Sequence, residues 1–342
     1  MIKKLYLLLL FIFIGFTKVL AQTTLDVDFT GLGFLDNREY KDFVARSRTY
    51  SGTRTSLSLG LNIDSMNRFV VGTNAIHEFG AQPYFLTANP IAYYNFRGKS
   101  WNFFAGEFPR EGLLTSYPRA FLNDTMLYYR PNVEGLLAQY HSAHFTETGW
   151  IDWVSRQTAT QREEFLFGFS GKYRPSVNGP FYIEHYTLLL HDAGAAVLLP
   201  NDHIMENGGA EILLGLDLTK KQTLLDSLTL QAGWMMTMAR VRGLDGWQTG
   251  QGFMSNIYGS FGHFAVRNEF YSGQPGQALS YGDTFYTKKF YNRLDLIWSA
   301  FNARGLKGQF VLSIHRTPGF TSNQEAFRVT YDLGRRKIAT FK

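Results

Sequence analysis

The sequence has no cysteine and few charged residues. Among its 342 residues only 18% are charged. The absence of cysteine excludes a disulfide-stapled scaffold and a zinc site with cysteine ligands. After residue 21, no apolar run reaches the roughly 18 residues that a membrane-spanning helix needs. An inner-membrane helical protein is therefore excluded as well.

Aromatic residues and glycine, in contrast, are abundant. The chain carries 30 Phe, 19 Tyr, 6 Trp and 33 Gly. A disordered chain has few aromatic residues, and a helix-rich chain has little use for so much glycine. This composition favours an aromatic-rich all-β protein.

Residues 1–21 have the three parts of a secretory signal peptide. Two lysines precede an apolar run over 5–16, and the small residue Ala21 precedes the expected cleavage site. Cleavage leaves a single domain over 22–342 and removes three lysines, which lowers the formal charge of +6 by three. The remaining basic residues are dispersed, so we expect no nucleic-acid partner.

Apolar and polar residues alternate along much of the mature chain. Over 327–333 every odd-numbered residue is apolar and every even-numbered one is polar or charged. The same period recurs over 25–30, 57–63, 164–170 and 210–217. This period predicts strands with two unlike faces. The whole pattern predicts about sixteen strands, within a range of 14–18.

The predicted connections fall into two classes. Long connections follow only odd-numbered strands, at 36–52, 109–132, 192–208 and 273–288. Short turns follow most even-numbered strands. A soluble β-sandwich has no reason to separate loop lengths in this way, whereas an antiparallel transmembrane β-barrel has long extracellular loops and short periplasmic turns. We therefore expect a barrel in the outer membrane, in contact with its lipid and reached by export through the periplasm.

With these features the mature chain resembles the sixteen-stranded porin-like barrels of Gram-negative outer membranes. Such barrels fold a long third loop into the lumen, and here that loop spans 109–132. The resemblance implies a constriction formed by its charged residues and assembly as a homotrimer. The segment 35–40 resembles loop openings in the same group, and the tail after Leu333 departs from porins, which end on an aromatic residue in the last strand. The implied constriction residues are Arg110, Glu111, Arg119, Asp124 and Arg130.

Alternation also predicts which strand residues line the lumen. Both charge signs are represented, which favours passive diffusion of small hydrophilic solutes, with oligosaccharides as one class. This interpretation requires neither a cofactor nor a metal. The predicted lumen residues are Asp26, Asp28, Glu164, Lys172, Glu184, Glu211, Asp217, Arg267, Glu269, Arg293, Asp295, Lys307, Arg328 and Asp332.

Two alternatives stay open. One is a barrel hydrolase with a His/Asp site at the outer rim, where His191-Asp192 and Asp202-His203 occur. No Gly-x-Ser-x-Gly sequence is present, and neighbours in sequence point apart on a strand, so we expect that the protein is not an enzyme. The other is a structural or adhesion barrel, in which the 109–132 loop would pack as a plug.

Overall fold

The computed structural model describes residues 23–341, apart from 86, 198–201 and 220–223. The expected signal peptide over 1–21 lies outside these residues. Within the described residues, no helix is both long enough and apolar enough to cross a membrane.

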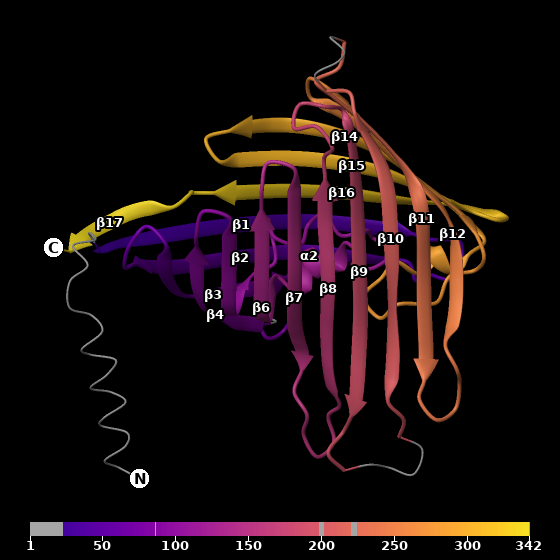
Figure 1. Ribbon diagram of the computed structural model, residues 1–342, viewed down its shortest axis with the longest axis horizontal. Coiled ribbons are helices and arrows are strands. Elements are labelled where there is room, and N and C mark those ends of the chain that lie inside the picture. The colour runs from indigo at the N-terminus through magenta and orange to yellow at the C-terminus, as the bar shows by residue number, and fades with distance from the viewer. Residues whose placement is uncertain (1–22, 86, 198–201, 220–223, 342) are drawn as a thin grey trace.

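The described chain is almost entirely antiparallel β-structure (Figure 1). Sixteen of its strands follow one another around the wall, and a short seventeenth follows them. The strands are β1 Thr23–Glu39, β2 Arg48–Asn62, β3 Asn67–Glu78, β4 Thr87–Arg97, β5 Trp101–Pro109, β6 Asn132–His141, β7 Phe145–Ser155, β8 Glu163–Tyr173, β9 Phe181–Gly194, β10 Met205–Asp217, β11 Ser227–Val241, β12 Gln248–Phe261, β13 Phe264–Gly273, β14 Phe290–Ala303, β15 Leu306–Thr317, β16 Phe320–Asp332 and β17 Arg336–Phe341.

Pairing of the first strand with the last two closes the sheet. The outer part of β1, from Thr30 to Glu39, pairs with β16, and its first residues pair with β17. Gly334, at φ +67°, adopts the left-handed backbone between these strands, a conformation that favours glycine. The prediction of an all-β antiparallel barrel with about sixteen strands is therefore confirmed. The tail after Leu333 forms a strand of its own.

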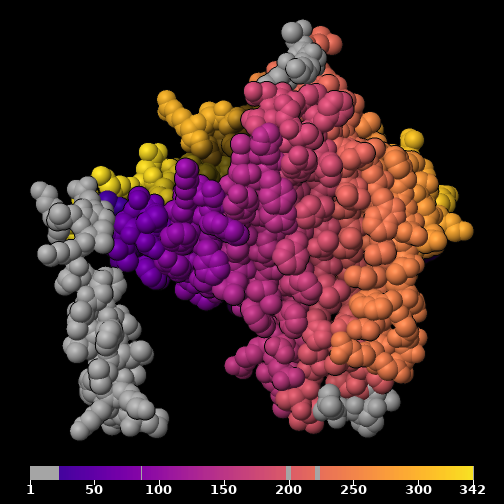
Figure 2. Space-filling model, in the orientation of Figure 1, coloured from indigo at the N-terminus to yellow at the C-terminus, as the bar shows by residue number. Residues whose placement is uncertain are grey.

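The wall has an apolar outer face. Large apolar side chains at alternate positions are exposed, for example Leu59 at 42%, Leu214 at 66% and Val266 at 45%. Their neighbours in sequence point into the lumen. Figure 2 shows the convex outer surface formed by neighbouring strands from β6 to β12. This exterior is the kind of surface that lipid tails cover.

Several strands extend beyond their predicted ends. The expected 36–52 connection is too long, because β1 runs to Glu39 and β2 starts at Arg48. Asp36 and Arg38 both point inward and form an ion pair at 2.8 Å, so polar residues continue the inward face of β1. Similarly, β9 runs to Gly194 and β10 starts at Met205. Long and short connections nevertheless lie at opposite ends of the barrel, here called the long-loop end and the short-turn end.

Two long-loop segments fold back into the lumen and form a plug, defined as residues 110–131 and 274–289. The first contains α2 (Thr125–Tyr129), and the second contains the 3-10 helix η1 (Thr284–Thr287). Backbone hydrogen bonds join the two segments, from Asn123 N–H to the Tyr281 carbonyl and from Asp283 N–H to the Arg119 carbonyl, both at 2.8 Å. They therefore behave as one unit.

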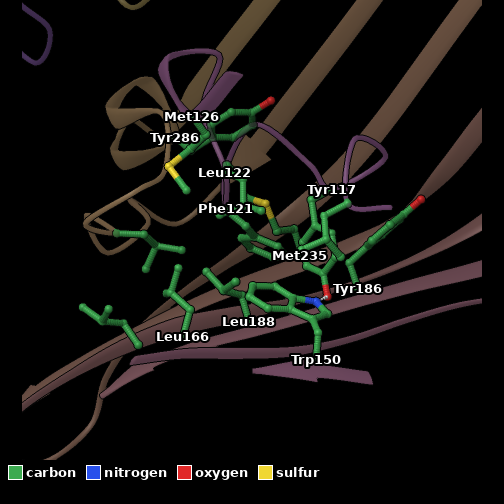
Figure 3. Packing of buried hydrophobic residues seen from close by; sticks show 14 of the residues in the cluster. Tyr117, Phe121, Leu122, Met126, Trp150, Leu166, Tyr186, Leu188, Met235 and Tyr286 are labelled. Carbon is green, nitrogen blue, oxygen red and sulfur yellow. Dashed lines mark hydrogen bonds between the residues drawn. The ribbon is translucent and has the colours of Figure 1, made fainter. Parts of the chain in front are cut away.

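The plug is held by an apolar core inside the barrel. Phe121, Leu122 and Met126 are buried against wall residues that include Leu188 and Met235 (Figure 3). Each such side chain contributes roughly 1.5–3 kcal/mol when it is fully buried. The middle of the lumen is therefore packed with apolar side chains where the plug meets β9 and β11.

Candidate functional site

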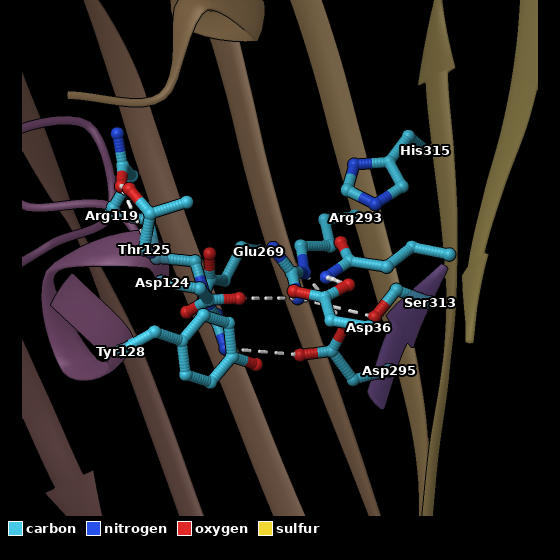
Figure 4. A network of polar contacts seen from close by, with 12 residues as sticks. Asp36, Arg119, Asp124, Thr125, Tyr128, Glu269, Arg293, Asp295, Ser313 and His315 are labelled. Carbon is cyan, nitrogen blue, oxygen red and sulfur yellow. Dashed lines mark hydrogen bonds and ion pairs between the residues drawn. The ribbon is translucent and has the colours of Figure 1, made fainter. Parts of the chain in front are cut away.

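An ionic network joins the plug to the opposite wall of the lumen (Figure 4). Arg119 lies 3.1 Å from Asp124 and 3.3 Å from Asp295, and it also contacts Glu269. Arg293 lies 3.2 Å from Asp124 and 2.7 Å from Asp295. The structure thus brings together residues that the sequence predicts for the lumen on β13 and β14 and in the third loop.

Each charge in this network faces an opposite one. Arg328 completes the set with a contact of 3.8 Å to Asp124. Burial opposes ionisation of Asp124, but Arg119, Arg293 and Arg328 outweigh it and hold the pKa of its carboxyl well below the usual range. Since a buried ion is tolerated only when it is paired, the network fixes the position of the plug.

Three other loop residues predicted for the constriction have separate partners. Arg110 forms a buried ion pair with Asp152. Glu111 lies 2.9 Å from Arg54 and is half exposed. Arg130 donates to the Val154 carbonyl at 3.2 Å. These contacts attach the ends of the first plug segment to the wall.

The Arg110–Asp152 pair supplies a stability prediction. Both residues are buried, at 6% and 2% exposure. Arg110→Met leaves the Asp152 carboxylate without its partner, which is expected to cost about 3–5 kcal/mol of unfolding free energy. Urea unfolding in detergent micelles, followed by tryptophan fluorescence, measures this loss. The double variant Arg110→Met/Asp152→Asn is expected to recover at least half of it. Equal midpoints for the wild type and Arg110→Met would contradict the prediction.

The remaining predicted pore residues also point into the lumen. Glu164 accepts a hydrogen bond from the Tyr281 hydroxyl at 3.3 Å. Glu184 forms an ion pair with Lys172 at 2.7 Å. Arg267 has no ion pair among the described residues. The lumen therefore carries both charge signs along its wall.

A second polar group, the β9–β11 rim cluster, lies at the long-loop end of the wall. It consists of His191, Glu206, Arg240 and Arg242. The His191 Nδ1 atom lies 3.1 Å from the Glu206 carboxylate, and both arginines also contact that carboxylate. His191, Glu206 and Arg240 occupy one row across three neighbouring strands.

The β9–β11 rim cluster faces outward, away from the lumen. Glu206 shares its strand face with Ile212 and Leu214, which are 49% and 66% exposed. Leu190, next to His191, is buried on the lumen side. Asp192 is buried too, so the sequence pair His191-Asp192 is split between the two faces. Charged groups are tolerated at the long-loop end of the wall, because the free-energy cost of a charge on the lipid-facing side falls toward the membrane interface.

A third group, the β16–β2 rim cluster, faces outward on another part of the rim. It contains Asn37, Glu39, Thr49, Asn323 and Glu325. Asn323 donates to Glu325 at 2.7 Å, Asn37 donates to Glu325 at 3.1 Å, and the Thr49 hydroxyl donates to Asn37 at 2.8 Å. Asn37 and Glu39 belong to the 35–40 segment noted in the sequence. The cluster has hydrogen-bonded carboxylates but no histidine.

None of these groups is arranged as a metal centre. Across the described residues, no three His, Asp or Glu side chains are placed to hold a metal ion.

A family model described as Lipid A 3'-O-deacylase-type matches residues 17–336. The chain belongs to this family. No curated protein matches the sequence.

Membership of the deacylase family corrects one expectation. The sequence led us to expect that the protein is not an enzyme, and this expectation is wrong, because the family is one of enzymes. A hydrolase needs no Gly-x-Ser-x-Gly sequence, and its active-site residues need not be adjacent in sequence. Two neighbouring strands can bring such residues together across the sheet.

Solved structures of porins have the same fold as this deacylase-family chain. The loop L8 deletion mutant of OmpT from Vibrio cholerae superposes with a TM-score of 0.57 at 10% identity, covering 91% of this chain and 99% of that one. The anion-selective porin from Comamonas acidovorans gives 0.56 at 10%, with the same coverage. Salmonella typhi OmpF in complex with daunomycin gives 0.52 at 11%, covering 90% and 97%. The fold is therefore that of porin-like outer-membrane barrels.

The residues predicted from the sequence did not include most of the β9–β11 rim cluster. Glu206, Arg240 and Arg242 belong to the β9–β11 rim cluster but were not among the predicted site residues. Glu206 and Arg240 become neighbours only through the register of β10 with β11. A polar residue among outward-facing apolar ones, such as Glu206 before Ile212, was the available signal.

Proposed function

We propose that this protein is an outer-membrane hydrolase that removes an acyl chain from an ester of a lipid A-type glycolipid at the outer rim. The observation that carries the proposal is the His191–Glu206 pair, which faces outward beside Arg240 and Arg242. The family supplies the reaction class, and the rim cluster supplies groups that suit it. Long loops face the cell exterior, so this rim meets the outer leaflet.

His191 has the position of a general base. A carboxylate only accepts hydrogen bonds, so the Nδ1 atom that faces Glu206 carries the proton. The Nε2 atom is then free to take a proton from water. The two arginines fix the Glu206 carboxylate, and Glu206 in turn orients the imidazole, which also packs against Phe165 with ring centroids 5.0 Å apart. Many hydrolases use such a pair, in which a histidine acts as the general base and a carboxylate holds the imidazole in position.

The arginines are suited to the charge that develops during ester hydrolysis. Water deprotonated by His191 attacks the acyl carbonyl, and the negative charge of the tetrahedral intermediate forms on its oxygen. Arg240 and Arg242 each keep N–H groups beyond those that contact Glu206, because a guanidinium carries five. Collapse of the intermediate breaks the bond to the sugar oxygen, which receives the proton from His191. The products are a fatty acid and a glycolipid with one free hydroxyl.

The plug in the middle of the lumen supports an activity on the outer face. The plug packs the middle of the barrel with apolar side chains such as Phe121 and Met126. A lipid, in contrast, reaches the rim directly from the leaflet that surrounds the wall. The acyl ester of a lipid lies between headgroup and tail, at the height of the membrane interface.

The test is conversion of lipid A by the full chain refolded in detergent micelles. We expect mass spectrometry to show loss of one ester-linked acyl chain and gain of a hydroxyl, with an equal amount of free fatty acid. Amide-linked chains are expected to stay. Heat-modifiable migration in gel electrophoresis shows whether the barrel is folded. The proposal is overturned if the folded barrel leaves lipid A intact after prolonged incubation.

Passive diffusion is the second candidate function. One observation favours it: Arg119, Asp124 and Glu269 place both charge signs inside the lumen, as a filter for small hydrophilic solutes would require. Conductance of the intact protein in a planar bilayer tests this candidate. Stable single-channel steps would support it, and a silent barrel would exclude it.

A further inference from the structure

A cavity of about 520 Å³ lies in the lumen on the short-turn side of the plug. Its strand residues come from near the short-turn ends, such as Glu184 close to the start of β9 and Arg267 close to the start of β13. Tyr117 and Arg119 of the plug form the opposite wall. This volume is within the range of small-molecule sites.

Glu211 on β10 is an unusual member of this lining. Its residue is 2% exposed, and neither carboxylate oxygen has a hydrogen-bond partner among the described residues. It shares the inward face of β10 with the buried Leu213. The residue lines the cavity, and both of its carboxylate oxygens are shielded from solvent. A buried polar group without a partner is costly.

The neighbouring charges do not relieve this cost. The charges that act on Glu211 are the carboxylates of Glu184 and Glu269. Glu184 is paired with Lys172, and Glu269 with Arg119. Within the described part of the chain, Glu211 is therefore the member of this acidic trio that lacks a cation.

An organic cation suits the unpaired Glu211 carboxylate better than a metal ion does. The described carboxylates do not converge as metal ligands do. Tyr186 and Tyr286 line the same cavity, and Met254 adds apolar surface. Aromatic rings attract ammonium groups, and the apolar surface suits a hydrocarbon body.

We propose that this cavity binds a small organic amine, with its ammonium group against Glu211. Both oxygens are shielded in this structure, so the Glu211 side chain turns toward the cavity when the amine binds. The carboxylate then gains a charge-assisted hydrogen bond, and the amine exchanges water for the tyrosine rings. The site lies inside the lumen, whereas the β9–β11 rim cluster faces outward. The inference is therefore independent of the deacylase activity.

Isothermal titration calorimetry of the full chain in detergent tests the proposal, with benzylamine, tyramine and spermidine as probes. We expect saturable binding of at least one amine, weakened at least about tenfold by Glu211→Gln, since a hydrogen bond to a charged group contributes about that much. Glu211→Asp keeps the charge and is expected to keep part of the affinity. Benzyl alcohol, the uncharged counterpart of benzylamine, is expected to bind more weakly.

Glu164→Gln is the matched control, because Glu164 is a lumen carboxylate outside this cavity lining. We expect it to bind amines as the wild type does. The proposal is overturned if none of the three amines binds saturably, or if Glu211→Gln binds them as tightly as the wild type. Equal affinity for benzyl alcohol and benzylamine would also overturn it, because the site would then not select for charge.

Discussion

Replacing His191 with asparagine is expected to lower the rate of lipid A deacylation by about 10²–10⁴-fold, the usual contribution of a general base. Asparagine keeps a polar side chain beside Glu206 but cannot accept a proton from water. Initial rates of fatty-acid release, measured at saturating and subsaturating lipid A in mixed micelles, quantify the loss. The lower rate is expected with little change in apparent KM, because His191 acts on the water rather than holding the lipid.

Glu206→Gln separates orientation from proton transfer. The variant keeps the size of the side chain but removes the charge that fixes the Nδ1–H tautomer of His191. In a hydrolase triad this kind of change costs up to about 10⁴-fold, so we expect a large decrease here as well. The double variant His191→Asn/Glu206→Gln is expected to be no slower than His191→Asn alone, since both residues act as one unit.

His203→Ala is the matched histidine control. The His203 backbone carbonyl, rather than its side chain, accepts a hydrogen bond from Arg162, so its removal is expected to leave deacylation unchanged. Asn37→Ala and Glu325→Gln probe the β16–β2 rim cluster instead. Full activity of His191→Asn together with loss of activity in either of these two variants would move the active site to that cluster and refute the assignment of His191.

Alternation in the sequence was sufficient to predict the wall. Along β16, Phe327 points to the lipid face and Arg328 to the lumen, as the pattern over 327–333 predicts. The reason is physical: a strand that separates lipid from a polar interior must change polarity at every residue. Strand ends were less predictable. The inward-facing Asp36 and Arg38 form an ion pair, and β1 therefore continues past its last apolar residue.

The plug and the rim site needed three-dimensional information. The sequence gives no direct signal that Phe121 packs against Leu188 or that Arg119 meets Asp295, since these contacts join segments distant in the chain. The proposed catalytic pair, His191 and Glu206, was missed for the same reason. Searching for a carboxylate next to His191 in sequence selects Asp192, which points to the opposite face, whereas the register of β9 with β10 selects Glu206.

Replacing residues 111–129 with a short Gly-Ser linker is expected to open the barrel. The change removes the apolar core of the plug and the Arg119 and Asp124 charges that attach it to the wall. Barrels of this strand number leave an aqueous channel when no segment fills them. We expect single-channel conductance in planar bilayers to rise at least about tenfold over that of the intact protein.

The same linker placed in the 156–162 connection is the matched control for this replacement. That connection lies outside the plug, so its replacement is expected to leave conductance unchanged. Arg119→Ala/Asp124→Ala provides a milder variant that keeps the apolar core, and we expect it to conduct between the two extremes. If the intact protein already conducts as well as the plug-replaced variant, the plug does not close the lumen. That result would strengthen the diffusion candidate and leave the rim hydrolase to be decided by the His191 variants alone.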